Sequence, residues 1–318
     1  MEKKPPKILA LTLNPSIDHI LITDSISLYN KNKVINSRIF YGGKGINAAF
    51  TLGKLGANCL ALAILGKSEE NFFCEKLHQV GVETNFILTP EETRHNYKIH
   101  DTRKGKDTEF NETGSRVTDH ELSLISDLLD KAIEDSSWLI LSGSLPPGIP
   151  EDYYQEFIKK AKEKKVLTCL DASGEALRTA VDARPDVLRI NRSELEELCE
   201  NKLINDDQVK YEINQIHRIG ISRIVISSSA QSVIAFDGCE FWKVKAPKVV
   251  PVSLTGAGDA MTAALVYQLS EGKSFQESIL FSTAVATASV LCEKPGDFLL
   301  GDFQRFIKEM DIQRIKCS

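Results

Sequence analysis

The feature that most constrains this chain is the regular alternation of short apolar runs with helical patterns. Residues 8–13 form a continuous apolar stretch, which is typical of a strand buried on both faces of a parallel sheet. Further predicted strands span 60–65, 138–141, 166–170, 187–190 and 224–227, and predicted helices span 45–55, 69–79, 118–134 and 151–164. The C-terminal part is predicted to be mostly helical. This order predicts an α/β fold, with a parallel sheet covered by helices on both faces.

Two polar, strand-like segments, residues 18–40 and 97–111, interrupt that alternation because no helical pattern accompanies them. We expect a small sheet that projects from the main body and can close over a substrate. A pair of surface hairpins is the alternative. No linker, composition shift or repeat marks a boundary, so a single domain over residues 1–318 is expected, with lid strands at about 14–42 and 94–113.

Composition narrows the function classes. The 318 residues carry a net charge of −5, which provides no electrostatic footprint for nucleic acid. The seven cysteines are scattered without a C-x-x-C pair, which favours reduced thiols and a cytoplasmic location. No apolar run is long enough to cross a bilayer, and the N-terminus does not resemble a secretion signal. Residues 278–291 come closest, and a buried helix is expected there.

A glycine-rich turn at residues 255–259 precedes an apolar helical run at 260–266. Gly256 and Gly258 allow a sharp turn, and the N–H groups at the start of the helix favour an anion. Asp259 would repel a phosphate there, yet its carboxylate can accept a proton from an attacking hydroxyl, which suggests phosphoryl transfer to an alcohol. The alternative is a simple turn with an N-capping Asp. A Walker A loop and a dinucleotide fingerprint are both absent from the sequence.

Four other short segments carry candidate binding residues. The cluster Gly42–Ala49 combines glycines with Lys44, a point charge suited to phosphate, and Asn47, which can bond sugar hydroxyls. Candidates elsewhere are Asp18 after the first strand, Arg94 as a fork for phosphate, and Asn191 with Glu194, spaced to hold a hydrated magnesium ion. Each has an ordinary alternative as a turn, a helix cap or a solvated charge.

The order of these segments is more informative than any one of them. The set comprises Asn14–Asp18, Gly42–Asn47, Thr93–Asn96, Ser142–Pro146, Asp171–Gly174, Asn191–Glu194 and Gly256–Asp259. Together they resemble the ribokinase-like (PfkB) sugar kinases, in the branch that holds 1-phosphofructokinase and tagatose-6-phosphate kinase. The resemblance spans residues 8–291. It implies a Rossmann-type three-layer αβα core with a small β-sheet lid, often used for homodimer contacts.

The resemblance also implies roles for individual residues. Asp259 would be the catalytic base, and Gly256, Ala257 and Gly258 would form an anion hole. The sugar phosphate would be held by Asp18, Gly43, Lys44, Asn47, Arg94 and Asn96. Asn191 and Glu194 would order Mg²⁺ and ATP, the metal through water, while Ser227, Ser228, Ser229, Ser232 and Gly258 would line the nucleotide site. The expected acceptor is tagatose 6-phosphate, through O1, or fructose 1-phosphate, through O6, each giving a 1,6-bisphosphate.

The sequence departs from the family pattern at three places. Serines replace both glycines of the nucleotide loop at residues 227–232, which predicts a reshaped loop. Arg189 stands where a lysine is common, and Tyr41 replaces a small residue before Gly42. Two other functions therefore stay open: a non-catalytic sensor of sugar phosphate or nucleotide, and a kinase of an unphosphorylated sugar or nucleoside.

Overall fold

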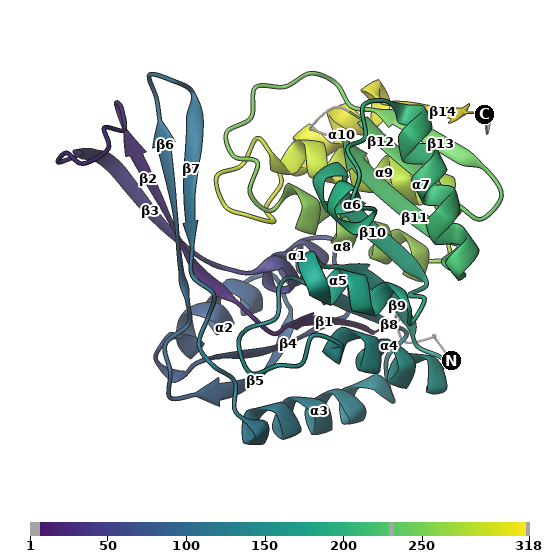
Figure 1. The fold of residues 1–318 in the computed structure, drawn as a ribbon, viewed down its shortest axis with the longest axis horizontal. Coiled ribbons are helices and arrows are strands. Elements are labelled where there is room, and N and C mark those ends of the chain that lie inside the picture. Colours follow the sequence, from purple (N-terminus) through teal and green to yellow (C-terminus); the bar gives the residue numbers. More distant parts are fainter. Residues whose placement is uncertain (1–6, 229–231, 316–318) are drawn as a thin grey trace.

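The computed structural model describes residues 7–228 and 232–315, in which ten strands form one large sheet (Figure 1). Its order is β14-β13-β12-β11-β10-β9-β8-β1-β4-β5. Seven neighbouring strands run parallel: β1 (Ile8–Thr12), β4 (Cys59–Gly66), β5 (Glu83–Thr89), β8 (Trp138–Ser142), β9 (Leu167–Asp171), β10 (Val187–Asn191) and β11 (Arg223–Ser228). At one edge, β12 (Ser232–Phe236), β13 (Phe241–Lys245) and β14 (Asp311–Ile315) pair antiparallel.

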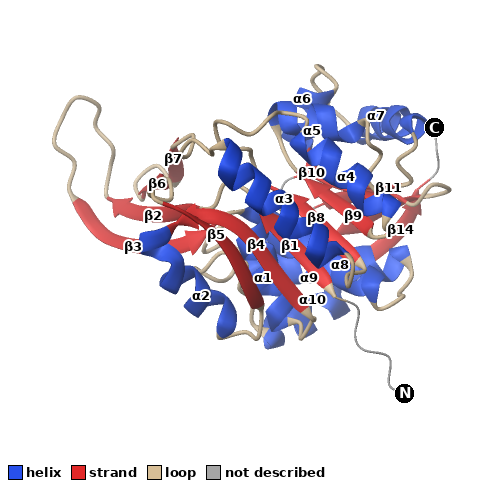
Figure 2. Cartoon of the chain, turned by 90° about the horizontal axis from the view of Figure 1, so that it is seen from below, coloured by secondary structure: helices blue, strands red, loops and turns tan. Residues whose placement is uncertain are grey.

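Helices cover both faces of this sheet (Figure 2). One face carries α1 (Lys44–Lys54), α2 (Glu70–His78), α8 (Ala257–Ser270) and α9 (Phe275–Ser289), with α10 (Leu300–Glu309) packed on α9. The other face carries α3 (Asp119–Ile133), α4 (Tyr153–Glu163), α5 (Gly174–Val181), α6 (Arg192–Leu198) and α7 (Asp206–Ile219). The expected three-layer αβα arrangement is confirmed.

The alternation of side chains along buried strands explains the two cores. In β1, Leu9 and Leu11 belong to the core beneath α3 and α4, whereas Ile8 and Ala10 belong to the core beneath α1 and α8. Successive side chains of a strand point to opposite faces, so a strand covered on both sides must be apolar throughout. This requirement produces the continuous apolar runs of the sequence.

A second sheet of four strands projects from the body at the upper left of Figure 1. It consists of β2 (Ser16–Thr23), β3 (Val34–Gly42), β6 (His95–Asp101) and β7 (Lys106–Asn111), in the order β3-β2-β6-β7. The two polar segments of the sequence thus pair with each other and form one separate sheet. In its register Asp18 of β2 stands opposite Asn96 of β6.

The C-terminal part differs from the sequence expectation because β12, β13 and β14 form the antiparallel edge of the large sheet. These strands are five residues each. β13 and β14 mix polar and apolar residues and lack the apolar run that marks a central strand, whereas the short apolar run of β12 was not recognised as a strand. Other local expectations are confirmed: Thr118 and Glu121 form the capping box of α3, and α9 is a buried helix. None of the described helices combines the length and apolarity needed to cross a bilayer.

Candidate active site

Two cavities meet at the carboxyl ends of the parallel strands, where ligands bind in open α/β sheets. The first, of about 390 Å³, lies beneath the small sheet and is lined by Asp18, Arg94, Asn96 and Lys98, among others. The second, of about 460 Å³, is lined by Arg189, Asn191, Ser227 and apolar side chains of α8 and α9. Lys44 and Asp259 line both cavities. The two spaces therefore share one cation and one carboxylate.

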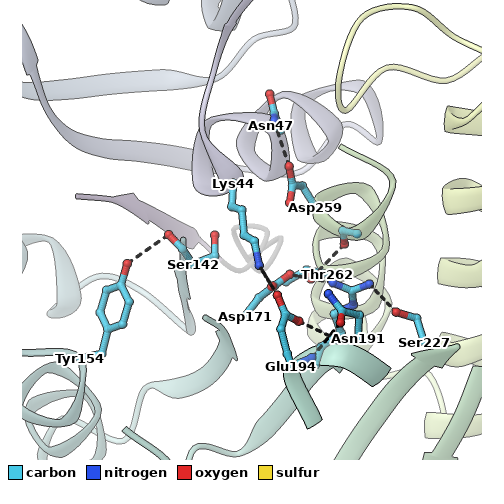
Figure 3. A network of polar contacts seen from close by, with 12 residues as sticks. Lys44, Asn47, Ser142, Tyr154, Asp171, Asn191, Glu194, Ser227, Asp259 and Thr262 are labelled. Atoms are coloured by element: carbon cyan, nitrogen blue, oxygen red, sulfur yellow. Dashed lines mark hydrogen bonds and ion pairs between the residues drawn. The ribbon is translucent and has the colours of Figure 1, made fainter. Parts of the chain in front are cut away.

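Asp259 lies in the first turn of α8 and is buried. The turn before it requires Gly256, whose φ of 84° lies in the left-handed region. One carboxylate oxygen, Oδ2, accepts a hydrogen bond of 2.9 Å from the Asn47 side chain (Figure 3). Burial raises the pKa of Asp259 to about 6, and the nearby Asp171 carboxylate contributes to the same shift. At neutral pH this carboxylate is still mostly ionised and is a stronger base than an exposed Asp.

The start of α8 presents backbone donors beside this carboxylate. The Ala257 N–H makes a long bond of 3.4 Å to the Leu254 carbonyl oxygen, while the N–H groups of Gly258 and Asp259 donate to no backbone carbonyl within the described residues. A side chain at position 258 would collide with Arg189, because a Cβ there would lie 2.6 Å from its Nη1. Glycine at this position thus leaves room for Arg189 beside the helix N-terminus, whose N–H groups favour an anion.

Lys44, at the start of α1, extends between two carboxylates (Figure 3). Its Nζ lies 2.9 Å from Asp171 Oδ1 and 3.0 Å from Glu194 Oε1. These two groups raise the pKa of Lys44 against the opposing effect of burial. The ammonium is therefore permanently charged, and it is held at the junction of the cavities by protein carboxylates.

Asp171, at the end of β9, organises the charges around Lys44. It is fully buried and also accepts hydrogen bonds from Arg189 Nη1, at 3.2 Å, and Thr262 Oγ1, at 2.6 Å. Burial alone would raise the pKa of Asp171, but Lys44 and Arg189 outweigh it and lower the pKa to about 2. Asp171 remains ionised throughout the physiological range and fixes both cations.

The first cavity gathers the residues that the sequence proposed for a sugar phosphate. Asp18 Oδ1 accepts hydrogen bonds from the side chains of Ser16 and Asn96. These bonds hold the Asp18 carboxylate at the wall of the first cavity. Gly43 has a φ of 110°, and a Cβ there would lie 2.9 Å from the backbone of Pro15. The chain therefore turns into α1 at a position that only glycine fills without strain.

Most of the Arg94 guanidinium is already hydrogen-bonded to the protein and is not as fully available to a phosphate as the sequence suggested it would be. Its guanidinium donates to the backbone carbonyl oxygens of Asn14, Pro15 and Glu112 at 3.0–3.2 Å. Two of these bonds hold the link between β1 and β2, and the third holds the residue that follows β7. Asn47 is also engaged at both ends of its amide, by Asp259 and by Lys76.

The second cavity contains most of the predicted nucleotide residues. Ser227 Oγ accepts a bond of 2.9 Å from Arg189 Nη2, and Ser232 lines the same cavity. Ser228 is buried at the end of β11. The predicted contact of Ser229 lies outside the described residues.

Asn191 and Glu194 also line the second cavity, but their side-chain oxygen atoms already accept hydrogen bonds. They form a reciprocal capping box at the start of α6, and the remaining Glu194 oxygen accepts from Lys44. No group of three or more His, Cys, Asp or Glu side chains suited to a metal ion occurs among the described residues. These two side chains therefore do not form a ready-made metal site by themselves.

Three functional candidates were not assigned from the sequence: Asp171, Lys98 and Lys76. Asp171 had a usable signal, since it is a carboxylate that directly follows a buried strand. Lys98 of β6 lines the first cavity and reaches Thr255 Oγ1 at 3.0 Å. Lys76 gave no signal, because a lysine on a helix is ordinarily solvated.

Gly256 allows a test of the turn. Replacing it by alanine (Gly256→Ala) places a Cβ 2.7 Å from the Gly296 nitrogen and 2.8 Å from the Pro295 Cα. We expect lower turnover of ATP, because this backbone must move and Asp259 with it, and a loss of stability above the roughly 1–2 kcal/mol of left-handed strain. Thermal unfolding and ADP release measure both.

Gly272→Ala is the matched control at the other end of α8. Gly272 has a φ of 74°, and a Cβ there meets nothing within 4 Å. The control variant has the strain of a left-handed backbone but no collision of the new Cβ, so we expect it to be less stable than the unmodified protein but fully active. Equal turnover in the two variants would contradict the role assigned to the turn.

Comparison with known proteins agrees with this geometry. The model of the family described as pfkB family carbohydrate kinase matches residues 11–299. A 1-phosphofructokinase of Borreliella burgdorferi is 31% identical over 89% of this chain and 92% of its own. A tagatose-6-phosphate kinase of Staphylococcus epidermidis is 28% identical over 96% and 99%. Among solved structures, phosphofructokinase-2 from Escherichia coli in complex with substrates and products superposes with a TM-score of 0.88, at 27% identity over 95% and 99% of the two chains.

Proposed function

Because the chain belongs to the PfkB family of carbohydrate kinases, we propose that it transfers the terminal phosphoryl group of ATP to a ketohexose monophosphate. The chain is an ATP-dependent sugar kinase, and its curated relatives act on sugar phosphates. The finer proposal concerns the acceptor. It is tagatose 6-phosphate, attacking through O1, or fructose 1-phosphate, attacking through O6, and the product in either case is a 1,6-bisphosphate.

The observation that carries this proposal is the meeting of two cavities at Asp259 and Lys44. Phosphoryl transfer needs an acceptor and a donor on opposite sides of one point, with a proton acceptor and positive charge at that point. The polar cavity beneath the small sheet suits a sugar phosphate. The cavity with apolar walls from α8 and α9 suits a nucleotide.

In the proposed reaction, Asp259 accepts the proton of the attacking hydroxyl as the new P–O bond forms and the bond to ADP breaks. The N–H groups of Gly258 and Asp259 and the Lys44 ammonium would stabilise negative charge on the transferring group. Asn47 would hold the base in place, because its amide donates to Oδ2. The Asp259 oxygen that Asn47 leaves available would face the acceptor.

Recognition of the phosphate already on the acceptor is proposed to involve Arg94, Lys44 and Lys98. All three line the first cavity, although each is also engaged by protein groups. Lys98 is paired with Asp107 and Glu109 of the small sheet, at 3.3 and 3.0 Å. A phosphate would compete with these exposed carboxylates for the ammonium, since surface ion pairs are weak.

Magnesium remains a prediction. Mg²⁺ usually keeps several waters and binds through substrate phosphates with one or two carboxylates. Glu194 is the carboxylate nearest this role, but its oxygens already accept from Lys44 and from the Asn191 backbone. We propose at most a water-mediated contact from Asn191 and Glu194 to an ion that arrives with ATP.

We propose further that the small sheet acts as a lid within a single domain. Lys98 contacts Thr255 next to the glycine turn, and Arg38 of β3 pairs with Glu293, so two side chains tie this sheet to the loops of the body. Its strands also expose Ile39, Phe110 and Val34. Such apolar exposure is consistent with a homodimer through the lid.

The direct test is to supply the purified protein with ATP, Mg²⁺ and each sugar phosphate in turn and to measure ADP release. We expect turnover with at least one of the two esters and much less with free fructose, tagatose or nucleosides. Turnover only on unphosphorylated sugars or nucleosides would replace the acceptor class. Absence of turnover with tight binding of the esters would instead indicate a sensor.

A further inference from the structure

A buried lysine lies behind the proposed base. Lys76 belongs to α2, and the residue is only 7% exposed. Its Nζ donates to the Tyr41 carbonyl oxygen at 2.7 Å and to Asn47 Oδ1 at 2.9 Å. Asn47 Nδ2 in turn donates to Asp259 Oδ2 at 2.9 Å. Lys76, Asn47 and Asp259 therefore form a continuous chain of hydrogen bonds that brings together α2, α1 and α8.

The chemistry of Lys76 and Asp259 fixes the direction in which this series of hydrogen bonds runs. A lysine ammonium has only donors, an ionised carboxylate has only acceptors, and an amide has one end of each kind. With Lys76 on one side, the Asn47 oxygen must face the ammonium, and its NH₂ group must face Asp259. A flipped amide would set donor against donor and oxygen against oxygen. The Lys76 ammonium, which predominates below its pKa of about 7, thus reinforces the one Asn47 orientation that the ionised Asp259 carboxylate also favours.

This orientation has a consequence for the proposed base. Oδ2 of Asp259 is held by Asn47, whereas Oδ1 receives no hydrogen bond within residues 7–228 and 232–315. Asp259 lines both cavities, so a fixed Oδ2 leaves the second oxygen for the acceptor hydroxyl. We propose that Lys76 is a positioning residue that acts through Asn47 to orient Asp259 for proton transfer. The inference rests on the proposed function, in which Asp259 is the base.

The burial of Lys76 supports a role beyond packing. Burial lowers the pKa of Lys76 to about 7, and the neighbouring Lys294 contributes to the same shift. Both ammonium groups lie near the Phe50 ring, with Nζ at 5.5 Å from its centroid for Lys76 and 4.1 Å for Lys294. Keeping a cation in this place costs stability, and a methionine of similar shape would avoid that cost. The same argument predicts that the methionine variant folds.

The test is a double-mutant cycle with Lys76→Met, Asn47→Ala and the combined variant, scored by kcat for ATP and the accepted sugar phosphate. We expect the lysine substitution to lower kcat about 10–100-fold, the size typical of residues that orient a site from behind. KM for ATP should stay within about twofold. The kcat of the combined variant should lie within about twofold of that of Asn47→Ala alone, because both substitutions interrupt the same series of hydrogen bonds.

Lys294→Met is the matched control. It removes the other ammonium beside Phe50, and no hydrogen bond joins Lys294 to Asn47 among the described residues. Its kcat should equal that of the unmodified protein. Lys76→Gln retains an N–H donor and should recover part of the lost activity.

Two results would overturn the inference: a kcat within twofold of the unmodified protein in Lys76→Met, or losses that multiply fully in the combined variant. If the methionine variant does not fold, the cycle with Lys76→Leu, which also lacks a donor, is judged by the same criteria. Failure of both variants to fold would assign Lys76 to the fold alone. The proposed function fails separately, through an inactive unmodified protein or a fully active Asp259→Asn variant.

Discussion

Asp259→Asn is expected to lower kcat by roughly 10²–10⁴-fold, the range that a general base contributes. Asparagine keeps the shape of the side chain and can still accept from Asn47, but it cannot take a proton from the acceptor. Binding of ATP should be preserved, since the second cavity is lined mainly by other residues. ADP release and nucleotide titration measure the two effects.

The same substitution should increase stability at neutral pH. Burial raises the pKa of Asp259 from 3.8 to about 6, so the folded protein holds this proton more tightly than the unfolded chain does. The stability that this bound proton contributes is fully present below pH 3.8 and is lost as the pH rises through 6. The ionised carboxylate therefore costs on the order of 2–3 kcal/mol at pH 7, and Asp259→Asn removes that cost. Thermal unfolding at pH 7 tests whether Asp259→Asn raises or lowers the stability.

Activity should follow the ionised form of the same group. Turnover in the unmodified protein is expected to fall about tenfold per unit as the pH drops below 6, because the proton occupies the base. Asp302→Asn is the control for the substitution, since Asp302 of α10 pairs with Arg305, outside both cavities. A kcat of Asp259→Asn within tenfold of the unmodified protein would reject Asp259 as the base.

Lys44→Met is expected to lower kcat by roughly 10²–10³-fold, comparable to removing one donor that stabilises charge in a transition state. Lys44 is the cation that both cavities share, so its loss affects the point where the phosphoryl group would move. The KM values should change less than kcat, because charge stabilisation in the transition state is what is lost. Steady-state kinetics with each substrate varied separates the two effects.

Stability should fall as well. Lys44 neutralises part of the charge of Asp171, which is completely buried, and of Glu194. Arg189 and Thr262 still compensate Asp171, and the Lys44 side chain is 30% exposed, so we expect a loss of about 1–3 kcal/mol. The pKa of Asp171 should rise from about 2 toward its ordinary value. Stability would then be lost at a higher pH on acidification than in the unmodified protein.

Lys54→Met provides the matched control. Lys54 lies at the other end of α1 and is also ion-paired, with Asp297, but it lines neither cavity. The control should keep its kcat within about twofold. If Lys44→Met were as active as Lys54→Met, the shared cation would have no part in the reaction, and the assignment of the cavity junction would be wrong.

Several features could be predicted from residues close together in sequence. The apolar run of β1 indicated a strand covered on both faces, and Thr118 with Glu121 located the start of α3. The glycine turn before Asp259 was visible because only a few residue types tolerate such a backbone. The edge strands β13 and β14 were missed because short, half-exposed strands have no distinct pattern.

The partners of the site residues could not be predicted in this way. Lys44 was expected to be free for a phosphate, yet it lies between Asp171 and Glu194, which are 127 and 150 residues away. Asn47 was expected to face sugar hydroxyls, and its amide is held by Lys76 and Asp259. The charge of a group depends on its neighbours in space. The spacing of residues along the chain does not show which residues those neighbours are.

By itself the sequence determined the α/β class, six of the seven parallel strands of the central sheet (all but β5), and the positions of Gly256 and Asp259. Periodicity and backbone tolerance are local properties, so a single chain displays them directly. Only the tertiary structure decided that two cavities share Asp259 and Lys44, and that a buried lysine lies behind Asn47. Those facts depend on packing between α1, α2, α8 and β9, where desolvation and neighbouring charges set what each side chain can do.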